Sequence, residues 1–198
     1  KKLSLILFLF VFTFHASAET NYSSDPKMFI SELVNDAIKK LSDKKFSLEE
    51  KKNFIKEIAL ENVDINALGL YTLGELRKST DKNVLIDYQK VFQKYFLKSL
   101  TSRLTDYSSS KFEVISAEQK SSSYTIVKSK MISNDSQPEI KIDWRVYTKN
   151  SNKPLIRDLI VEGLSLARTQ KEEFASILNS NNNEINILIS KLEEFLIK

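Results

Sequence analysis

The spacing of apolar residues changes twice along this chain of 198 residues, and these changes restrict its fold more than any other feature. Up to about residue 105 the apolar residues recur every three or four positions, which is typical of amphipathic helices. From 111 to 162 they alternate with polar residues or form short runs, which is typical of strands. After Gly163 the helical spacing returns. This order of segments predicts an α+β domain.

Four helices are predicted before the strands. The dipeptide Asp25-Pro26 and a capping box that begins at Ser47 mark the starts of the first two. We expect Asp64 to cap a short third helix that runs through Leu76. A long fourth helix is expected from position 80 or 81 to about 105, and two further helices follow Gly163 on either side of an Asn-rich turn. About six helices are therefore expected in all.

Four strands are predicted near 111–118, 123–133, 139–148 and 154–162. In the third, Ile140, Ile142, Trp144 and Val146 alternate with Lys141, Asp143, Arg145 and Tyr147. One face of this strand should therefore be dry and the other wet. Because the connections are short and rich in turn residues, we expect a four-stranded antiparallel meander with the helices as a layer against it.

The first 18 residues have the composition of a secretion signal. Two lysines precede the apolar run Leu3–Phe14, and Ala16-Ser17-Ala18 matches a signal-peptidase site. As a helix the twelve apolar residues would span about 18 Å, less than the roughly 30 Å of a bilayer core. We expect cleavage before Glu19, export to the periplasm, and a soluble mature domain over 19–198. Since residue 19 is not cysteine, a lipoprotein is not expected.

The mature chain would contain neither cysteine nor histidine, because His15 is the single histidine and the cysteine count is zero. Zinc sites built on these residues, and nucleophile systems that need them, are therefore excluded. Three glycines, at 69, 74 and 163, are too far apart for a phosphate-binding loop. We expect no metal and no cofactor.

The formal net charge of +4 is spread along the chain without a basic run. DNA-binding domains usually carry a basic stripe, because neutralising phosphates supplies much of their affinity. No nucleic-acid partner is therefore expected.

Two carboxylates have apolar neighbours that could raise a pKa for proton transfer, namely Asp143 and Asp158. Asp143 lies on the predicted wet face, and Asp158 is adjacent to Arg157. Structural charge pairs are the favoured interpretation of both.

Large apolar side chains without reactive neighbours are the remaining feature of interest. Phe92 and Phe96 lie on the long helix, Tyr71 and Leu73 on the short one, and Trp144 on the sheet. Periodicity does not distinguish a packed core from a lined cavity, so both interpretations stay open.

Four stretches of the chain resemble the MlaC family, also called the toluene-tolerance auxiliary family, of periplasmic phospholipid-binding proteins. They are Ala67–Gly74 (ALGLYTLG), Asp87–Phe96 (DYQKVFQKYF), Ile142–Val146 (IDWRV) and Ile156–Ser165 (IRDLIVEGLS). The last is the most specific, with the pattern D-x-x-x-E-G-x-S before a helix. The similarity runs from about residue 26 to 195, and the Asn-rich turn at 179–183 departs from it.

This resemblance implies a monomeric, non-enzymatic carrier that maintains outer-membrane lipid asymmetry. It would shuttle glycerophospholipid between an outer-membrane lipoprotein complex and an inner-membrane ABC transporter with an MCE-domain subunit. The pocket residues that it implies are Leu70, Tyr71, Leu73, Tyr88, Phe92, Phe96, Ile142, Trp144, Val146, Leu159, Val161 and Leu164.

Contacts with partners are expected on the wet face of the third strand, where Lys141 and Arg145 could meet acidic surfaces. Two alternatives stay open at this point. One is a small enzyme that uses Asp158 with Tyr71, and the other is a periplasmic chaperone whose apolar groove binds unfolded polypeptide.

Overall fold

The computed structural model describes residues 21–104, 110–133, 138–150 and 152–197. The predicted signal segment, the predicted end of the long helix near 105 and the turn at 134–137 lie outside these residues. The described residues form six α-helices, one 3-10 helix and one antiparallel sheet. The predicted α+β class is therefore confirmed.

The first two helices begin where their capping residues predict. α1 covers Pro26–Ser42, and the Asp25 carboxylate accepts a hydrogen bond from a first-turn amide at 2.9 Å. α2 covers Leu48–Asn62 and begins with the predicted capping box between Ser47 and Glu50. These side chains satisfy amides that have no acceptor within the helix.

The third helix is shorter than predicted. α3 covers Ile65–Thr72, and a separate 3-10 helix, η1, covers Gly74–Lys78. The predicted single helix through Leu76 is wrong because Gly74 has a φ of 57°. This left-handed conformation ends a right-handed helix. α4 then covers Lys82–Leu104.

Two helices follow the sheet, as predicted. α5 covers Leu166–Asn179 and α6 covers Ile185–Ile197. Between them, Asn182 and Asn183 have φ values of 52° and 61°. Asparagine tolerates this left-handed region better than most residues, so the Asn-rich turn separates the two helices.

The sheet has five strands, and the prediction of four is wrong. The strands are β1 Ser110–Ser121, β2 Tyr124–Ser133, β3 Ile140–Tyr147, β4 Leu155–Val161 and β5 Leu164–Ser165. Each pairs antiparallel with the next along the chain, which confirms the meander. The fifth strand forms because Glu162 and Gly163 have φ values of 49° and 82°, the geometry of a tight hairpin turn. Because β5 has only two residues, alternation of apolar and polar residues in the sequence does not reveal it.

β4 contains an extra residue where it pairs with β3. Arg145 pairs with Asp158, whereas the following Val146 pairs with Ile156. Arg157 is therefore the additional residue of a β-bulge, which changes the side to which the flanking residues point. Ile156 faces α1, while Asp158 lies on the opposite face with Arg145.

β3 has the predicted dry and wet faces. Trp144 and Val146 are buried, whereas Lys141 and Arg145 are exposed. The Trp144 indole donates a hydrogen bond to the buried Ser129 hydroxyl at 2.9 Å. The polar atom of this large ring is therefore satisfied inside an apolar layer.

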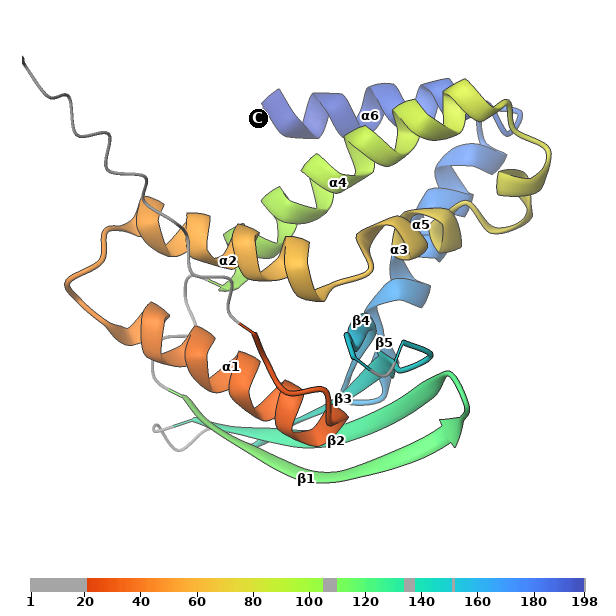
Figure 1. Ribbon diagram of the computed structural model, residues 1–198. Coiled ribbons are helices and arrows are strands. Elements are labelled where there is room, and N and C mark those ends of the chain that lie inside the picture. Colours follow the sequence, from red (N-terminus) through yellow and green to blue (C-terminus); the bar gives the residue numbers. More distant parts are fainter. Residues whose placement is uncertain (1–20, 105–109, 134–137, 151, 198) are drawn as a thin grey trace, which may run out of the picture.

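Apolar side chains form two main clusters. Figure 1 shows α1 lying along the sheet, with α4 and α6 in a layer further from it. The sheet cluster, between α1 and the sheet, consists of Phe29, Ile30, Leu33, Val34, Phe112, Val127, Trp144, Val146 and Ile156. The helix cluster, among α3 to α6, consists of Ile65, Leu73, Tyr88, Phe92, Phe174, Leu178, Ile185, Leu188 and Leu192. A smaller cluster of Leu41, Ile55 and Ile58 joins α1 to α2.

Candidate functional site

The structure divides the predicted pocket residues between the two clusters. Four belong to the sheet cluster or pack against it: Ile142, Trp144, Val146 and Leu159. Four others belong to the helix cluster or pack against it: Leu73, Tyr88, Phe92 and Phe96. The remaining four are half-buried or exposed: Leu70, Tyr71, Val161 and Leu164. The structure therefore does not gather the twelve side chains into a single apolar cluster.

The two clusters meet where α2 ends and α3 begins. The Val63 side chain packs against both clusters. Its backbone forms a parallel bridge with Ile156 of β4, and the Asp64 amide donates to the Ile156 carbonyl oxygen at 2.9 Å. We call Val63 and Asp64, together with Ile156 and Arg157, the seam. A ligand that lay between the clusters would border this seam.

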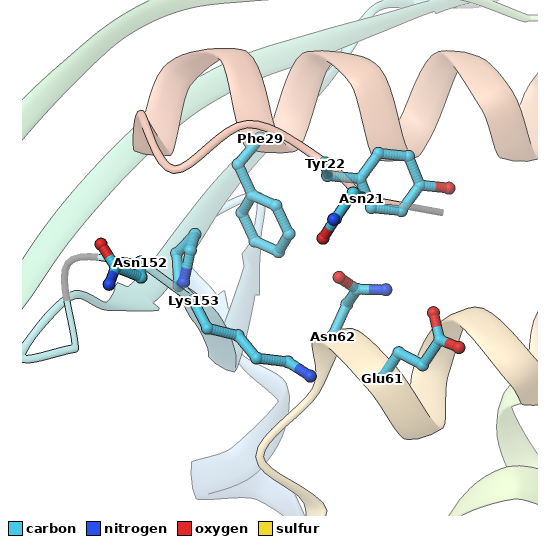
Figure 2. Close-up of a pocket in the computed structure, with 8 residues that line it drawn as sticks. Asn21, Tyr22, Phe29, Glu61, Asn62, Asn152 and Lys153 are labelled. Atoms are coloured by element: carbon cyan, nitrogen blue, oxygen red, sulfur yellow. The ribbon is translucent and has the colours of Figure 1, made fainter. Parts of the chain in front are cut away.

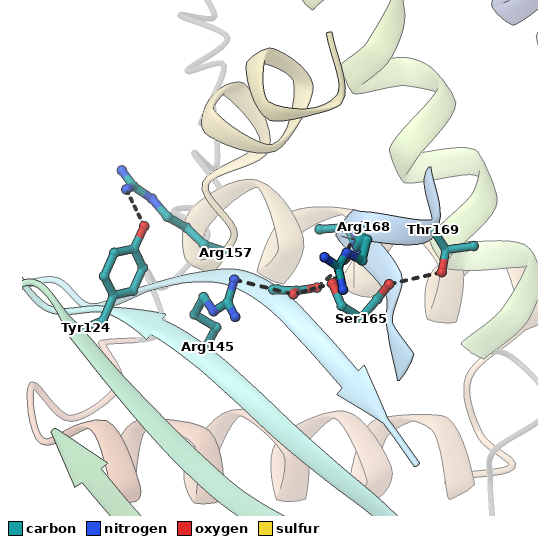
Figure 3. A network of polar contacts seen from close by, with 8 residues as sticks. Tyr124, Arg145, Arg157, Ser165, Arg168 and Thr169 are labelled. Carbon is teal, nitrogen blue, oxygen red and sulfur yellow. Dashed lines mark hydrogen bonds and ion pairs between the residues drawn. The ribbon is translucent and has the colours of Figure 1, made fainter. Parts of the chain in front are cut away.

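An ion pair between Arg157 and Asp64 stabilises the seam. The Arg157 guanidinium donates to one Asp64 oxygen from Nη2 at 2.7 Å and from Nε at 2.8 Å, while the other oxygen caps α3, as predicted. Arg157 also lies 3.5 Å from the Tyr147 ring centre and donates to the Tyr124 hydroxyl at 3.3 Å (Figure 3). Burial lowers the pKa of Arg157, but the hydrogen bonds to Tyr124 and Asp64 outweigh this effect and the pKa is raised. Arg157 is therefore a fixed cation.

Two hollows share Glu61 and Lys153, and the second of them borders the seam at Val63 and Asp64. The first, of about 80 Å³, is lined by Asn21, Tyr22, Phe29, Glu61, Asn62, Asn152, Lys153 and Pro154 (Figure 2). The second, of about 270 Å³, is lined by Leu60, Glu61, Val63, Asp64, Ile65, Asn66, Gln93, Lys153 and Leu155. Pockets for drug-sized ligands measure about 300–1,000 Å³. Each hollow is therefore too small for a whole diacyl lipid unless the side chains of the clusters move apart.

Asp158 is a structural carboxylate that joins β4 to α5. It is 4% exposed, and it accepts hydrogen bonds from the Ser165 hydroxyl at 2.6 Å and the Ala167 amide at 3.0 Å. An Arg145 nitrogen lies 3.8 Å from it (Figure 3). The interpretation as a charge pair is confirmed. The partner is Arg145 and not the adjacent Arg157, because the bulge directs Arg157 to the seam.

The D-x-x-x-E-G-x-S pattern thus has a physical basis. Asp158 holds Ser165, Glu162 and Gly163 form the hairpin turn, and Ser165 caps α5 by accepting from the Arg168 amide at 3.0 Å. The pattern fixes how β4 leads into α5. Both Asp158 oxygens accept hydrogen bonds in this arrangement.

The other candidates for chemistry are also accounted for. Asp143 is half-buried on the wet side of β3 and has no ion-pair partner among the described residues, so the charge-pair interpretation is wrong for Asp143. Tyr71 is 39% exposed, and the Lys171 ammonium lies 5.1 Å from its ring centre. Within the described ranges, no three His, Cys, Asp or Glu side chains are grouped so that they could hold a metal ion. In that same part of the chain, no helix has the length and apolarity needed to cross a membrane.

Close packing between α3 and α4 holds the helix cluster together. A Cβ added to Gly69 would lie 2.9 Å from the Cδ1 atom of Phe92, so α3 approaches α4 closely at this point. The buried Tyr88 and Thr72 hydroxyls form a 2.7 Å hydrogen bond. Burial raises the pKa of Tyr88, and this phenol is therefore neutral in the folded protein.

Sequence reasoning missed the residues that border the seam and the hollows. Val63 follows the last residue of α2, where helical spacing no longer indicates burial, and the position of Arg157 depends on the bulge. Glu61 and Lys153 have the pattern of solvated surface charges. Asp64 was identified as a cap, but its second role with Arg157 has no local signal in the sequence.

The fold defines a class of α+β proteins in which a helix-covered antiparallel meander joins a separate apolar helical layer. This chain belongs to the MlaC family, because the family model described as MlaC protein matches residues 31–194. The predicted resemblance is thereby confirmed.

The fold is also similar to that of a solved structure, the phospholipid-binding protein from Ralstonia solanacearum in complex with a phospholipid. The TM-score is 0.70 at 16% sequence identity, and the match covers 85% of this chain and 97% of the other. A comparison with curated proteins found no match.

Proposed function

We propose that this protein is a phospholipid carrier that holds the acyl chains of a glycerophospholipid between the sheet cluster and the helix cluster. The observation that carries the proposal is the fold shared with a protein that has a phospholipid bound. Membership of the MlaC family supports it. The two apolar clusters that meet at Val63 offer the surfaces that acyl chains need.

The energetics of acyl-chain burial suit a carrier. Each buried CH₂ is worth about 0.8 kcal/mol, so two chains of about 16 carbons gain roughly 25 kcal/mol relative to water. The same chains already have this energy in a bilayer. A carrier must therefore match the bilayer closely, so that lipid can be both taken up and released.

In the fuller form of this proposal, the protein is exported to the periplasm and shuttles lipid between the two membranes. Its partners would be the outer-membrane lipoprotein complex and the inner-membrane ABC transporter with an MCE-domain subunit. Lys141 and Arg145 stay the proposed docking cations. Arg145 lies 3.8 Å from buried Asp158, so reversing its charge would also disturb the fold. Lys141→Glu is the cleaner test, and it should slow transfer to the partner complexes.

Organic extraction and native mass spectrometry of the purified protein test lipid binding. We expect glycerophospholipid to co-purify, and stripped protein to reload from phospholipid vesicles. Failure to carry lipid in both experiments would contradict the proposal. Binding of unfolded polypeptide without lipid would favour the chaperone alternative.

Sequencing the N-terminus of exported protein tests its localisation. The mature chain should begin at Glu19, because Ala16-Ser17-Ala18 offers the small side chains that signal peptidase requires. A membrane-bound product that retains Leu3–Phe14 would contradict a soluble carrier.

A further inference from the structure

Two opposite charges face the same space beside the seam. Glu61 at the end of α2 and Lys153 before β4 line both hollows. Figure 2 shows the Lys153 side chain extending toward the end of α2, where Asn62 and Glu61 lie. Within the part of the chain that the structure describes, neither the Glu61 carboxylate nor the Lys153 ammonium has an ion-pair or hydrogen-bond partner. Asp64 also lines the second hollow, but Arg157 already neutralises it.

The hollows lie at the border between the two apolar layers. Phe29 of the sheet cluster lines the first hollow, and Ile65 of the helix cluster lines the second. Val63, which contacts both clusters, also lines the second. A polar group in the hollows would therefore sit next to apolar chains inserted between the clusters.

We propose that Lys153 and Glu61 form a head-group subsite for a zwitterionic phosphoethanolamine lipid. Lys153 binds the phosphate and Glu61 binds the ammonium group, so each charge gains an opposite partner. The second hollow, of about 270 Å³, has room for a phosphoethanolamine group, which carries a phosphate and an ammonium group a few bonds apart. This inference rests on the proposed lipid-carrier function and adds a head-group preference to it.

A competition assay measures this preference independently of the total lipid load. Stripped protein is incubated with vesicles of equal phosphatidylethanolamine and phosphatidylglycerol that also contain diacylglycerol, and the bound lipids are counted by mass spectrometry. Lys153→Gln should lower the ratio of phospholipid to diacylglycerol about three- to tenfold, the range for a partly solvated charge-assisted bond. Glu61→Gln should lower the ratio of phosphatidylethanolamine to phosphatidylglycerol about threefold. Diacylglycerol lacks the phosphate, and phosphatidylglycerol lacks the ammonium group.

Matched controls come from the same elements. Lys149 is exposed near Lys153 and Glu57 is exposed one turn before Glu61, and neither lines a hollow. Lys149→Gln and Glu57→Gln should leave both ratios at the wild-type values. The Glu61 and Lys153 side chains make no polar contact in the described chain, so their variants should melt within a few degrees of wild type.

The outcomes separate the two proposals. If wild type loads lipid but Lys153→Gln and Glu61→Gln match their controls in both ratios, the head-group subsite is refuted while the carrier function stands. If stripped wild type loads neither phospholipid nor diacylglycerol, the carrier function itself fails. The subsite is supported if Lys153→Gln lowers the ratio of phospholipid to diacylglycerol, Glu61→Gln lowers the ratio of phosphatidylethanolamine to phosphatidylglycerol, and the control variants lower neither.

Discussion

Replacing Asp158 with alanine should destabilise the fold by about 3–5 kcal/mol. The carboxylate is 4% exposed and accepts two hydrogen bonds, from the Ser165 hydroxyl and the Ala167 amide. Hydrogen bonds to a charged group are worth about 1.5–3 kcal/mol each, and their loss leaves both donors without an acceptor. Arg145 adds little to this figure, because its side chain is 44% exposed and solvent screens the pair.

The substitution Asp158→Asn should cost less, about 1–3 kcal/mol, because the amide oxygen still accepts one hydrogen bond. Urea denaturation followed by circular dichroism measures both losses. Asp143→Ala is the matched control, since Asp143 lies on the same face of the adjacent strand, half-buried, without a side-chain partner in the described chain. We expect it to change stability by less than about 1 kcal/mol.

If Asp158→Ala and Asp143→Ala lower the free energy of unfolding equally, Asp158 does not stabilise the connection between β4 and α5. The Asp158→Asn variant also tests the enzyme alternative. Below its melting temperature this variant should still bind lipid, because we expect Asp158 to stabilise the fold and not to take part in a reaction. Loss of an enzymatic turnover in a folded Asp158→Asn protein would contradict this.

Three further predictions concern the two clusters. Gly69→Ala should cost about 1–3 kcal/mol in a urea melt, because the new methyl would lie 2.9 Å from Phe92, and Phe92→Leu should relieve part of the cost. Burial raises the pKa of Tyr88, so the contribution of this buried phenol to stability is complete below about pH 10 and is lost as pH rises toward the folded-state pKa. In an ultraviolet titration, Tyr88 should stay neutral after the exposed tyrosines ionise. Early ionisation of all seven tyrosines would contradict the burial of Tyr88. Leu159→Trp should reduce bound phospholipid with little change in the urea midpoint, since Leu159 is half-buried beside Trp144; a large drop in midpoint with unchanged lipid would identify it as core.

Local signals in the sequence predicted most of the fold. Caps such as Asp25 and Ser47 act within one turn of helix, so their effect can be read without knowing the tertiary structure. The strand alternation around Trp144 is equally local. The sequence did not predict three features: the helix break at Gly74, the fifth strand after Gly163 and the bulge at Arg157. Each depends on one or two residues in unusual backbone conformations or pairings.

The candidate site was less predictable than the fold. Periodicity shows that the residues around Phe92 and Trp144 each have a buried side, but not which layer covers it. The structure assigns them to different clusters. Glu61 and Lys153 are 92 positions apart in the chain, and only the tertiary fold brings them to one hollow.

The twelve-residue β1 strand has a consequence for self-association. It is one edge of the sheet, so its outer backbone groups offer a template on which another chain could add a strand. Pairing irregularities lie between Val114 and Ser116 and between Gln119 and Ser121, and charged side chains such as Lys111 and Glu118 are exposed along it. An incoming strand would have to follow two kinks and bring its own charges close to those of the edge. Two copies of this protein that meet at high concentration are thus kept from joining their sheets, even though one face of each sheet is apolar.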